Sequence, residues 1–269
     1  MKTVLSSATA RRGFTVLELL VVVGVLVTLI ALSLPGFQSA RLQAWKMASA
    51  SNLRQLTEAN MAYAADNGRF VPADDWWNNR RWCGARVSVG SSYDATKGLL
   101  AEYLGKSRRV TPCPLFTQML QRQPIKSFEY GSGGYGYNAY VGGSVPGEYD
   151  GSAQRLRVSL PATRVASPVE TIMFGTTALA YGDRVQEYPY LEPPFWVNAD
   201  GSTNGSRPTP SLHFRFNGQA IVSWCDGHVS FEISDDRGAG YNPYGGDARK
   251  QHLGWFGPDE NNGYWNPQK

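Results

Sequence analysis

Two histidines and an aspartate in the last third of the chain have side chains that could do chemistry. His213 is followed further along by Asp226-Gly227-His228, and imidazole and carboxylate groups serve as zinc ligands and as general acids or bases. Asp-Gly is also a preferred two-residue turn of a β-hairpin, and an ideal turn of this kind puts His213 and His228 on opposite faces of the sheet. We therefore expect a structural role for these three residues, with a metal or catalytic site as the alternative.

Asp200 and Asn204 are candidate calcium ligands. They lie in the hexapeptide Asp200-Gly-Ser-Thr-Asn204-Gly, which has the composition of a calcium loop but lacks the downstream glutamate that completes one. We expect an ordinary surface loop and no cofactor, with calcium binding near Asp200 as the alternative. The sequence has no nucleophile elbow and no glycine-rich phosphate loop, so we do not expect an enzyme.

The chain has three cysteines, Cys83, Cys113 and Cys225. No two of them have Cys-x-x-Cys spacing, which argues against a structural zinc site. In an oxidising compartment one disulfide and one remaining thiol are the natural outcome, and three pairings are open. We favour a disulfide between Cys83 and Cys113, because both lie in loop-like sequence beside tryptophan or proline.

Glu18 is the most unusual titratable residue, because it interrupts an apolar run. Residues 14–34 carry no other charge, and as a helix they would be about 31 Å long, which matches the hydrocarbon core of a bilayer. A carboxylate in hydrocarbon costs at least a few kcal/mol, so it indicates a function and a partner. Arg11 and Arg12 precede the run, which predicts a cytoplasmic amino terminus and a large remainder outside the cytoplasm.

Cleavage after Gly13 would supply the partner that Glu18 lacks. It would create a new α-amino group on Phe14, four residues before the glutamate. An ammonium group on a neighbouring subunit could then neutralise the carboxylate where the helices of two subunits pack side by side.

The segment Arg12-Gly-Phe-Thr-Val-Leu-Glu-Leu19 resembles the processing signal of type IV pilins and type II secretion pseudopilins. The resemblance implies that a prepilin peptidase cuts after Gly13 and methylates the new amino terminus at Phe14. It also implies that Glu18 registers the subunits during assembly. Some type II pseudopilins hold calcium in their carboxy-terminal region, which is a further reason to consider a site near Asp200.

The resemblance therefore implies a structural subunit of a type II secretion pseudopilus or of a type IV pilus-like filament. Its partners would be the prepilin peptidase, its own copies, other pseudopilins, an inner-membrane assembly platform and the inner membrane itself. The precursor would cross that membrane once, with a periplasmic carboxy-terminal domain. Secretion, motility, adhesion and DNA uptake all stay open as purposes of the filament. A twin-arginine export signal and an uncleaved membrane anchor are the alternatives for the amino-terminal segment.

The pattern of apolar residues divides the chain into four parts. We expect a leader over residues 1–13, a membrane-spanning and filament-core helix over 14–35, an amphipathic helix over 36–68 and a β-rich domain over 69–269. Pro35-Gly36 should kink or loosen the helix, which then continues into the domain, and Asn67-Gly68 should end it. The predicted fold is α+β and pilin-like: a long amino-terminal helix packed on an antiparallel sheet with long loops.

A hairpin over residues 220–233 is the clearest strand signal. Asp226-Gly227 separates two alternating segments, and a two-residue turn pairs Trp224 with Val229 and Val222 with Phe231 on one face. The arrangement of a histidine followed by Asp-Gly-His-Val also resembles the carboxy-terminal signature of a large group of pseudopilin-like proteins. Trp-Cys stands in this sequence where that group often has Phe-Ala.

The net charge argues against a nucleic-acid partner. The 269-residue chain has a formal charge of +4, but Lys2, Arg11 and Arg12 lie in the expected leader, so its removal leaves +1. A nearly neutral protein has no electrostatic footprint for nucleic acid.

The abundance of aromatic residues suggests a rival function. The chain has 8 Trp, 14 Tyr and 11 Phe, and a membrane-anchored or minor-pilin binding module, such as an adhesin or receptor, would use some of them in its loops. In that case Trp76, Trp77, Trp82 and Tyr190 should form a contiguous exposed surface.

Overall fold

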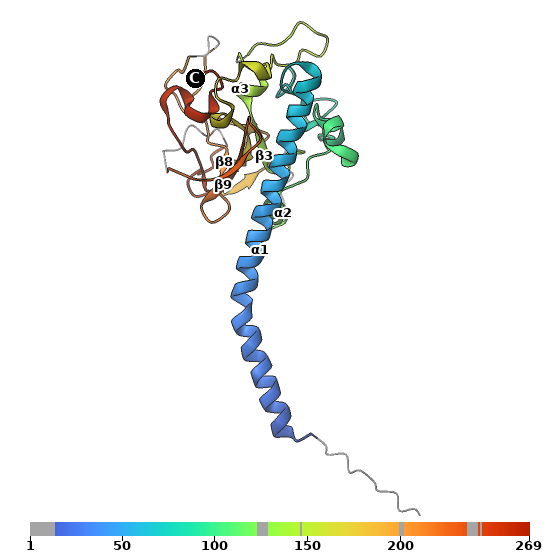
Figure 1. Cartoon of the computed structure of the whole chain (residues 1–269), viewed down its shortest axis with the longest axis vertical. Helices are drawn as coiled ribbons and strands as arrows, with labels where there is room; N and C mark the ends of the chain where they lie inside the picture. Colours follow the sequence, from blue (N-terminus) through green and yellow to red (C-terminus); the bar gives the residue numbers. More distant parts are fainter. Residues whose placement is uncertain (1–13, 123–128, 146, 199–201, 236–241, 243) are drawn as a thin grey trace, which may run out of the picture. The chain divides into compact units, whose positions relative to one another are not determined.

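A computed structural model of the chain describes residues 14–122, 129–145, 147–198, 202–235, 242 and 244–269. Its main helix is α1, Val16–Asn67 (Figure 1). The chain forms two compact units, of which one ends at Ala44 and the other begins at Trp45. The boundary between them falls inside α1, so both units contribute to this helix.

In the first unit, α1 is apolar on nearly every side. The side chains from Val16 to Ser33 are all exposed, and the helix is long and apolar enough to cross a membrane. The helix continues through Pro35 and Gly36, where the sequence predicts a kink or loosening. Proline lacks one backbone N–H, so the helix passes Pro35 with a single bond fewer in its ladder.

The end of α1 agrees with the sequence. The helix stops at Asn67 because Gly68 adopts a left-handed φ of +73°, and its N–H donates to the carbonyl of Ala64 at 2.8 Å. A glycine in this conformation is the usual way to end a helix.

Short elements follow α1 in the second unit. The strands are β1 Arg80–Arg81, β2 Gly84–Ala85, β3 Tyr135–Asn138, β4 Ile172–Thr176, β5 Leu179–Tyr181, β6 Arg184–Gln186, β7 Tyr190–Leu191, β8 Leu212–His213, β9 Gln219–Trp224, β10 Val229–Ile233 and β11 Leu253–Gly254. The helices are α2 Pro114–Gln121 and α3 Ala139–Gly142, with 3-10 turns η1 Ala95–Lys97, η2 Ala101–Tyr103, η3 Gly105–Ser107, η4 Ala162–Arg164, η5 Pro168–Glu170 and η6 Glu260–Trp265.

The central sheet has five strands in the order β10-β9-β4-β3-β7. All neighbours are antiparallel except β3 and β7, which run parallel. The α+β class predicted from the sequence is thus confirmed, but the sheet is mixed rather than wholly antiparallel. Long segments without regular structure connect the strands, as expected from the glycine and proline content.

Residues of α1 within the second unit pack on one face of this sheet. Leu53 and Thr57 are fully buried in this stretch, and Thr57 bonds to Ser223 of β9. The Lys46 ammonium donates to Gln219 Oε1 at 2.6 Å, and Asn60 Oδ1 accepts the N–H of Val71 at 2.8 Å. The helix is therefore fixed by directional bonds as well as by apolar contact.

An aromatic layer covers the opposite face of the sheet. Ala220, Val222 and Trp224 alternate along β9 and belong to a buried cluster that the carboxy-terminal residues complete. Those residues are Trp255, Phe256 and Trp265, with Tyr264 packed beside them. The Asn138 side chain donates to the carbonyls of Ile172 and Trp265, which joins the last turn of the chain to the sheet.

The β9–β10 hairpin is present, but its predicted register is wrong by one residue. Val229 pairs with Ser223 and Phe231 with Ile221. The loop has three residues, because the Trp224 carbonyl accepts the Gly227 N–H and the Trp224 N–H donates to the His228 carbonyl, both at 3.0 Å. Gly227 has a φ of +98°, as in a type I turn followed by a left-handed glycine. The shift moves Phe231 to the face of the sheet that α1 covers.

Candidate functional site

The first turn of α1 is closed by Thr15 and Glu18. The Glu18 carboxylate accepts hydrogen bonds from the Thr15 N–H and the Thr15 hydroxyl, both at 2.9 Å. In return, the Glu18 N–H donates to the Thr15 hydroxyl oxygen at 3.2 Å. This reciprocal pair is a capping box, which satisfies backbone donors that a helix start would otherwise leave free.

The capping box gives Glu18 a partner within its own chain that the sequence interpretation missed. The signal was present as Thr15-x-x-Glu18 just before an apolar run, which is the sequence signature of such a cap. Both bonds end on Oε2, and Oε1 accepts no hydrogen bond from any described residue. Phe14 is exposed beside this turn, and Gly13 lies outside the described residues.

His213 does not meet Asp226 and His228. His213 is buried on β8, where its Nδ1 has no hydrogen-bond partner within the described chain and its ring meets Phe116 edge-on. Burial, then the charge of Arg215, lowers the pKa of His213 well below 6.5. Asp226 Oδ1 instead accepts from the backbone N–H of His228 and lies 2.7 Å from His228 Nδ1 at the exposed hairpin loop.

His213 and His228 thus have different surroundings in this fold. The His228 ring stacks on Trp224, with ring centres 5.3 Å apart and planes at 9°. No group of three or more His, Cys, Asp or Glu side chains in the described part of the chain is arranged to hold a metal ion. Of the two calcium candidates, Asp200 lies outside the described residues, and Asn204 Oδ1 accepts the Ser206 N–H at 2.9 Å.

The predicted disulfide between Cys83 and Cys113 is not formed. Cys83, Cys113 and Cys225 are all free and buried. The Cys113 sulfur accepts a hydrogen bond from the Ser49 hydroxyl of α1 at 3.2 Å, so it belongs to the contact between helix and domain. Burial raises the pKa of Cys83 to about 12, which makes its thiol unreactive at neutral pH.

A cavity of about 330 Å³ lies among loops of the second unit. Six of the residues that line it are aromatic: Trp76, Tyr140, Tyr149, Tyr188, Tyr190 and Trp196. Asp74, Asp75, Glu192 and Arg157 contribute charge to the same walls. The lining comes from segments that are far apart in the sequence, so no local pattern could have identified this site.

Of the four aromatic residues predicted to form a binding surface, only Trp76 and Tyr190 line this cavity. Trp76 is 52% exposed and Tyr190 lines the cavity. Trp77 is 62% exposed but does not line the cavity, and Trp82 is fully buried in the core. The Trp82 ring packs against Phe174 with centres 5.2 Å apart. The four residues therefore do not form the contiguous exposed patch that was expected.

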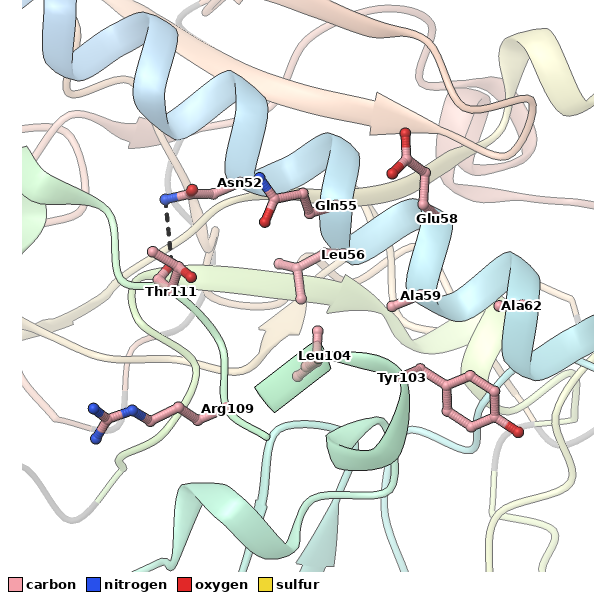
Figure 2. Close-up of a pocket in the computed structure, with 11 residues that line it drawn as sticks. Asn52, Gln55, Leu56, Glu58, Ala59, Ala62, Tyr103, Leu104, Arg109 and Thr111 are labelled. Atoms are coloured by element: carbon pink, nitrogen blue, oxygen red, sulfur yellow. Dashed lines mark hydrogen bonds between the residues drawn. The ribbon is translucent and has the colours of Figure 1, made fainter. Parts of the chain in front are cut away.

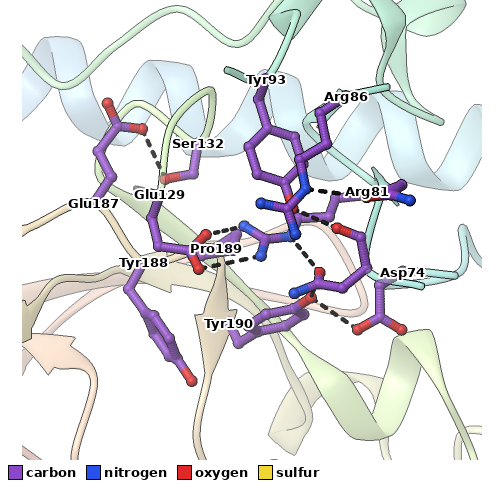
Figure 3. A network of polar contacts seen from close by, with 12 residues as sticks. Asp74, Arg81, Arg86, Tyr93, Glu129, Ser132, Glu187, Tyr188, Pro189 and Tyr190 are labelled. Atoms are coloured by element: carbon purple, nitrogen blue, oxygen red, sulfur yellow. Dashed lines mark hydrogen bonds and ion pairs between the residues drawn. The ribbon is translucent and has the colours of Figure 1, made fainter. Parts of the chain in front are cut away.

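A buried network holds one wall of this aromatic cavity (Figure 3). Arg81 is 1% exposed and forms a two-bond ion pair with Glu129, while its Nε donates to Asn78 Oδ1 at 2.7 Å. The Tyr190 hydroxyl lies 2.8 Å from Asp74 Oδ2, to which it donates, and 3.2 Å from the same Asn78 oxygen. The guanidinium also stacks over the Tyr93 ring at 4.4 Å. The loop that carries Trp76 is thus tied to the interior.

A second cavity of about 360 Å³ lies beside α1 (Figure 2). It is bordered by Asn52, Leu56 and Glu58 of the helix and by Tyr103 and Arg109 from the segment that follows. Asn52 Nδ2 donates to the carbonyl of Thr111 at 3.3 Å across one end. This cavity has one acid and one base and no cluster of titratable groups, so it offers less for ligand recognition than the aromatic cavity.

Comparisons with known proteins add no assignment. No protein-family model matches the chain, no curated protein is similar to it, and no solved structure matches its fold.

Proposed function

We propose that the chain is a structural subunit of a filament of the type IV pilin and type II pseudopilin kind. The observation that carries the proposal is the position of Glu18 in the first turn of α1. It is the one charged residue in a stretch of predominantly apolar, exposed side chains that runs from Val16 through Ser33. Such a surface must be covered by lipid or by other helices, and a filament core supplies the same helix from neighbouring subunits.

The geometry of the capping box bears on how Glu18 would act in assembly. Thr15 uses Oε2 and leaves Oε1 without a donor among the described residues. Cleavage after Gly13 would make an ammonium group on Phe14, and the amine of a neighbouring subunit would bind at Oε1. The carboxylate would then be fully hydrogen-bonded and charge-compensated, which makes its burial in an apolar core favourable.

The proposed route begins with a precursor that crosses the inner membrane once, with the second unit in the periplasm. The prepilin peptidase removes residues 1–13 and methylates Phe14. The mature subunit joins its own copies and other pseudopilins at the inner-membrane assembly platform. In this proposal the protein is the substrate of an enzyme rather than an enzyme, and the second unit is displayed along the filament.

Two substitutions separate the assembly role of Glu18 from its capping role. Glu18→Gln keeps an oxygen that accepts the Thr15 N–H, so the cap is retained and only the charge is lost. Thr15→Ala removes the hydroxyl of the cap and leaves the charge intact. We expect Glu18→Gln to abolish sedimentable filaments and Thr15→Ala to leave them at near wild-type amounts, when each full chain is expressed with its peptidase and assembly proteins.

Mass spectrometry of the amino terminus is the companion measurement. Wild type and both variants should begin at a methylated Phe14, which shows that a loss of filaments is a loss of assembly and not of processing. A mature protein that keeps residues 1–13 would refute the proposal. So would Glu18→Gln subunits that assemble as well as wild type, because the carboxylate would then be no more than a helix cap.

A further inference from the structure

The aromatic cavity of the second unit has the features of a ligand site. Its volume of about 330 Å³ falls in the range of small-molecule sites, which is roughly 300–1,000 Å³. Trp76 and Trp196 are 52% and 46% exposed at its walls. Exposure of half of a large indole ring to water is unfavourable. The flat apolar faces of these two rings are therefore suited to contact with a ligand.

The hydrogen bonds inside the cavity show which polar groups remain for a ligand. The Asp74 carboxylate is not available to a ligand. Arg157 donates to both of its oxygens, at 2.9 and 3.3 Å, and Tyr190 donates to one of them. Arg157 is occupied in the same pair and also donates to the Tyr149 hydroxyl oxygen at 3.3 Å. This ion pair therefore forms a wall of the cavity and is not the recognition group.

Two phenol groups are still able to donate. The Tyr149 oxygen accepts from Arg157, and the Tyr140 oxygen accepts from Asn262 Nδ2 at 3.0 Å. Neither phenol donates to any residue in the described part of the chain, so each O–H is available to an acceptor on a ligand. A buried or half-buried hydroxyl without an acceptor is unfavourable. The Tyr140 and Tyr149 hydroxyls therefore indicate where the acceptor groups of a ligand would bind.

Glu192 is the group that is still able to accept. Its Oε1 accepts from the Tyr188 hydroxyl at 2.5 Å, and Oε2 has no donor among the described residues. Burial raises the pKa of Glu192 above 4.5. The cavity thus presents two donors and one acceptor between aromatic walls.

We propose that this cavity binds a saccharide unit, with Trp76 and Trp196 against the sugar ring and with Tyr140, Tyr149 and Glu192 as hydrogen-bonding partners. A pyranose has C–H groups on its faces and hydroxyls on its edges, and each hydroxyl both donates and accepts. It therefore matches aromatic walls that carry donors and an acceptor together. An organic cation would also suit aromatic rings near a carboxylate, but it has no acceptor for the Tyr140 and Tyr149 hydroxyls.

The loop that carries Trp76 is ordered before any ligand binds. The Asp75 carboxylate accepts the Asn79 N–H at 2.7 Å, and Arg81 ties Asn78 to the buried Glu129 pair. The Trp76 ring meets the Tyr149 ring edge-on with centres 5.0 Å apart. A site fixed in this way loses little conformational entropy on binding. The inference does not depend on the proposed filament role, because it uses the second unit only.

The test is a titration of the full chain in nanodiscs whose lipids carry neither sugar nor quaternary ammonium groups. The probes are hexasaccharides of glucose in α- and β-linkage, of xylose and of N-acetylglucosamine, with tetramethylammonium as the cation. Binding is followed by tryptophan fluorescence and by saturation-transfer NMR. We expect at least one hexasaccharide to bind, and Trp76→Ala or Trp196→Ala to weaken it about tenfold, which is about 1.4 kcal/mol.

Trp77→Ala is the matched control, because Trp77 is the adjacent residue, is 62% exposed and does not line the cavity. It should leave the affinity unchanged. Tyr149→Phe and Tyr140→Phe should each weaken the saccharide severalfold while the melting temperature of the chain stays near wild type. The proposal is overturned if none of the hexasaccharides binds, or if tetramethylammonium binds and the two Phe variants leave its affinity unaffected. Equal losses from Trp77→Ala and Trp76→Ala would also overturn it.

Discussion

The hydroxyl of Thr57 on α1 lies 2.7 Å from the hydroxyl of Ser223 on β9, and both groups are fully buried. Ser223 in turn lies 3.5 Å from the carbonyl of Phe174 on β4. A helix that faces a sheet usually does so through apolar side chains. Here a polar chain crosses the contact, so the position of α1 along β9 is set by hydrogen bonds of fixed direction.

We expect Thr57→Val to destabilise the protein by about 1–2 kcal/mol, because the nearly isosteric change removes one buried hydrogen bond and leaves Ser223 without its donor. Ser223→Ala should cost a similar amount. Urea unfolding of the single variants and the double variant measures the coupling between them. A double variant that loses the full sum of both single losses would show that the two hydroxyls do not interact.

The buried pair of Arg81 and Glu129 leads to a second prediction. Glu129→Leu alone should destabilise the chain by about 3–5 kcal/mol, because it leaves the Arg81 charge buried without its counter-ion. The double variant Arg81→Met, Glu129→Leu should recover most of that loss. Thermal unfolding of the three proteins checks this order. A double variant less stable than Glu129→Leu would contradict it.

The burial of His213 predicts a pH dependence of stability. Its folded pKa lies well below 6.5, so the unfolded chain binds a proton on this residue at a pH where the folded chain does not. The free energy of unfolding should therefore be highest above pH 6.5 and fall as the pH drops below it, by up to about 1.4 kcal/mol per pH unit. His213→Met should flatten this slope.

The control for that prediction is His228→Gln, which removes an imidazole from the exposed hairpin loop. Urea unfolding between pH 5 and pH 8 should show a smaller slope for His213→Met than for either His228→Gln or wild type. Equal slopes in His213→Met and wild type would show that a residue other than His213 takes up the proton on unfolding.

The reactivity of the cysteine thiols tests the finding that Cys83 and Cys113 form no disulfide. A thiol reagent should label none of the three cysteines in the folded protein, because all are buried and burial raises the pKa of Cys83 to about 12 and that of Cys225 further. In denaturant without reductant, all three should react. Labelling of a single cysteine under those conditions would mean that two of them form a disulfide.

The sequence predicted the elements with strong local signals. The helix stop at Asn67-Gly68 was predictable, because turn chemistry acts over a few residues. The position of the turn at Asp226-Gly227 was predictable as well, but the length of the β9–β10 loop was not. Asp-Gly fits a two-residue turn and also the last two positions of a three-residue turn, so these two residues alone do not determine the loop length.

Other features had no local signal. Tyr135–Asn138 reads as a glycine-rich loop, yet it forms a central strand because Tyr137 stacks on Phe174 with ring centres 4.7 Å apart. A glycine at position 136 allows the close approach of Thr177, since a Cβ there would lie 2.4 Å from its methyl carbon. Tertiary contacts of this kind override strand propensity. The aromatic cavity is likewise assembled only by the fold.

The aromatic layer on the sheet comes from the last stretch of the polypeptide, Leu253 to Trp265. A ribosome makes this stretch after every strand of the central sheet, so this face of the sheet lacks its aromatic cover until residues 253–265 have been synthesised. A stop codon near position 250 would therefore give a chain whose central sheet has an exposed apolar face. Such a face favours aggregation and proteolysis.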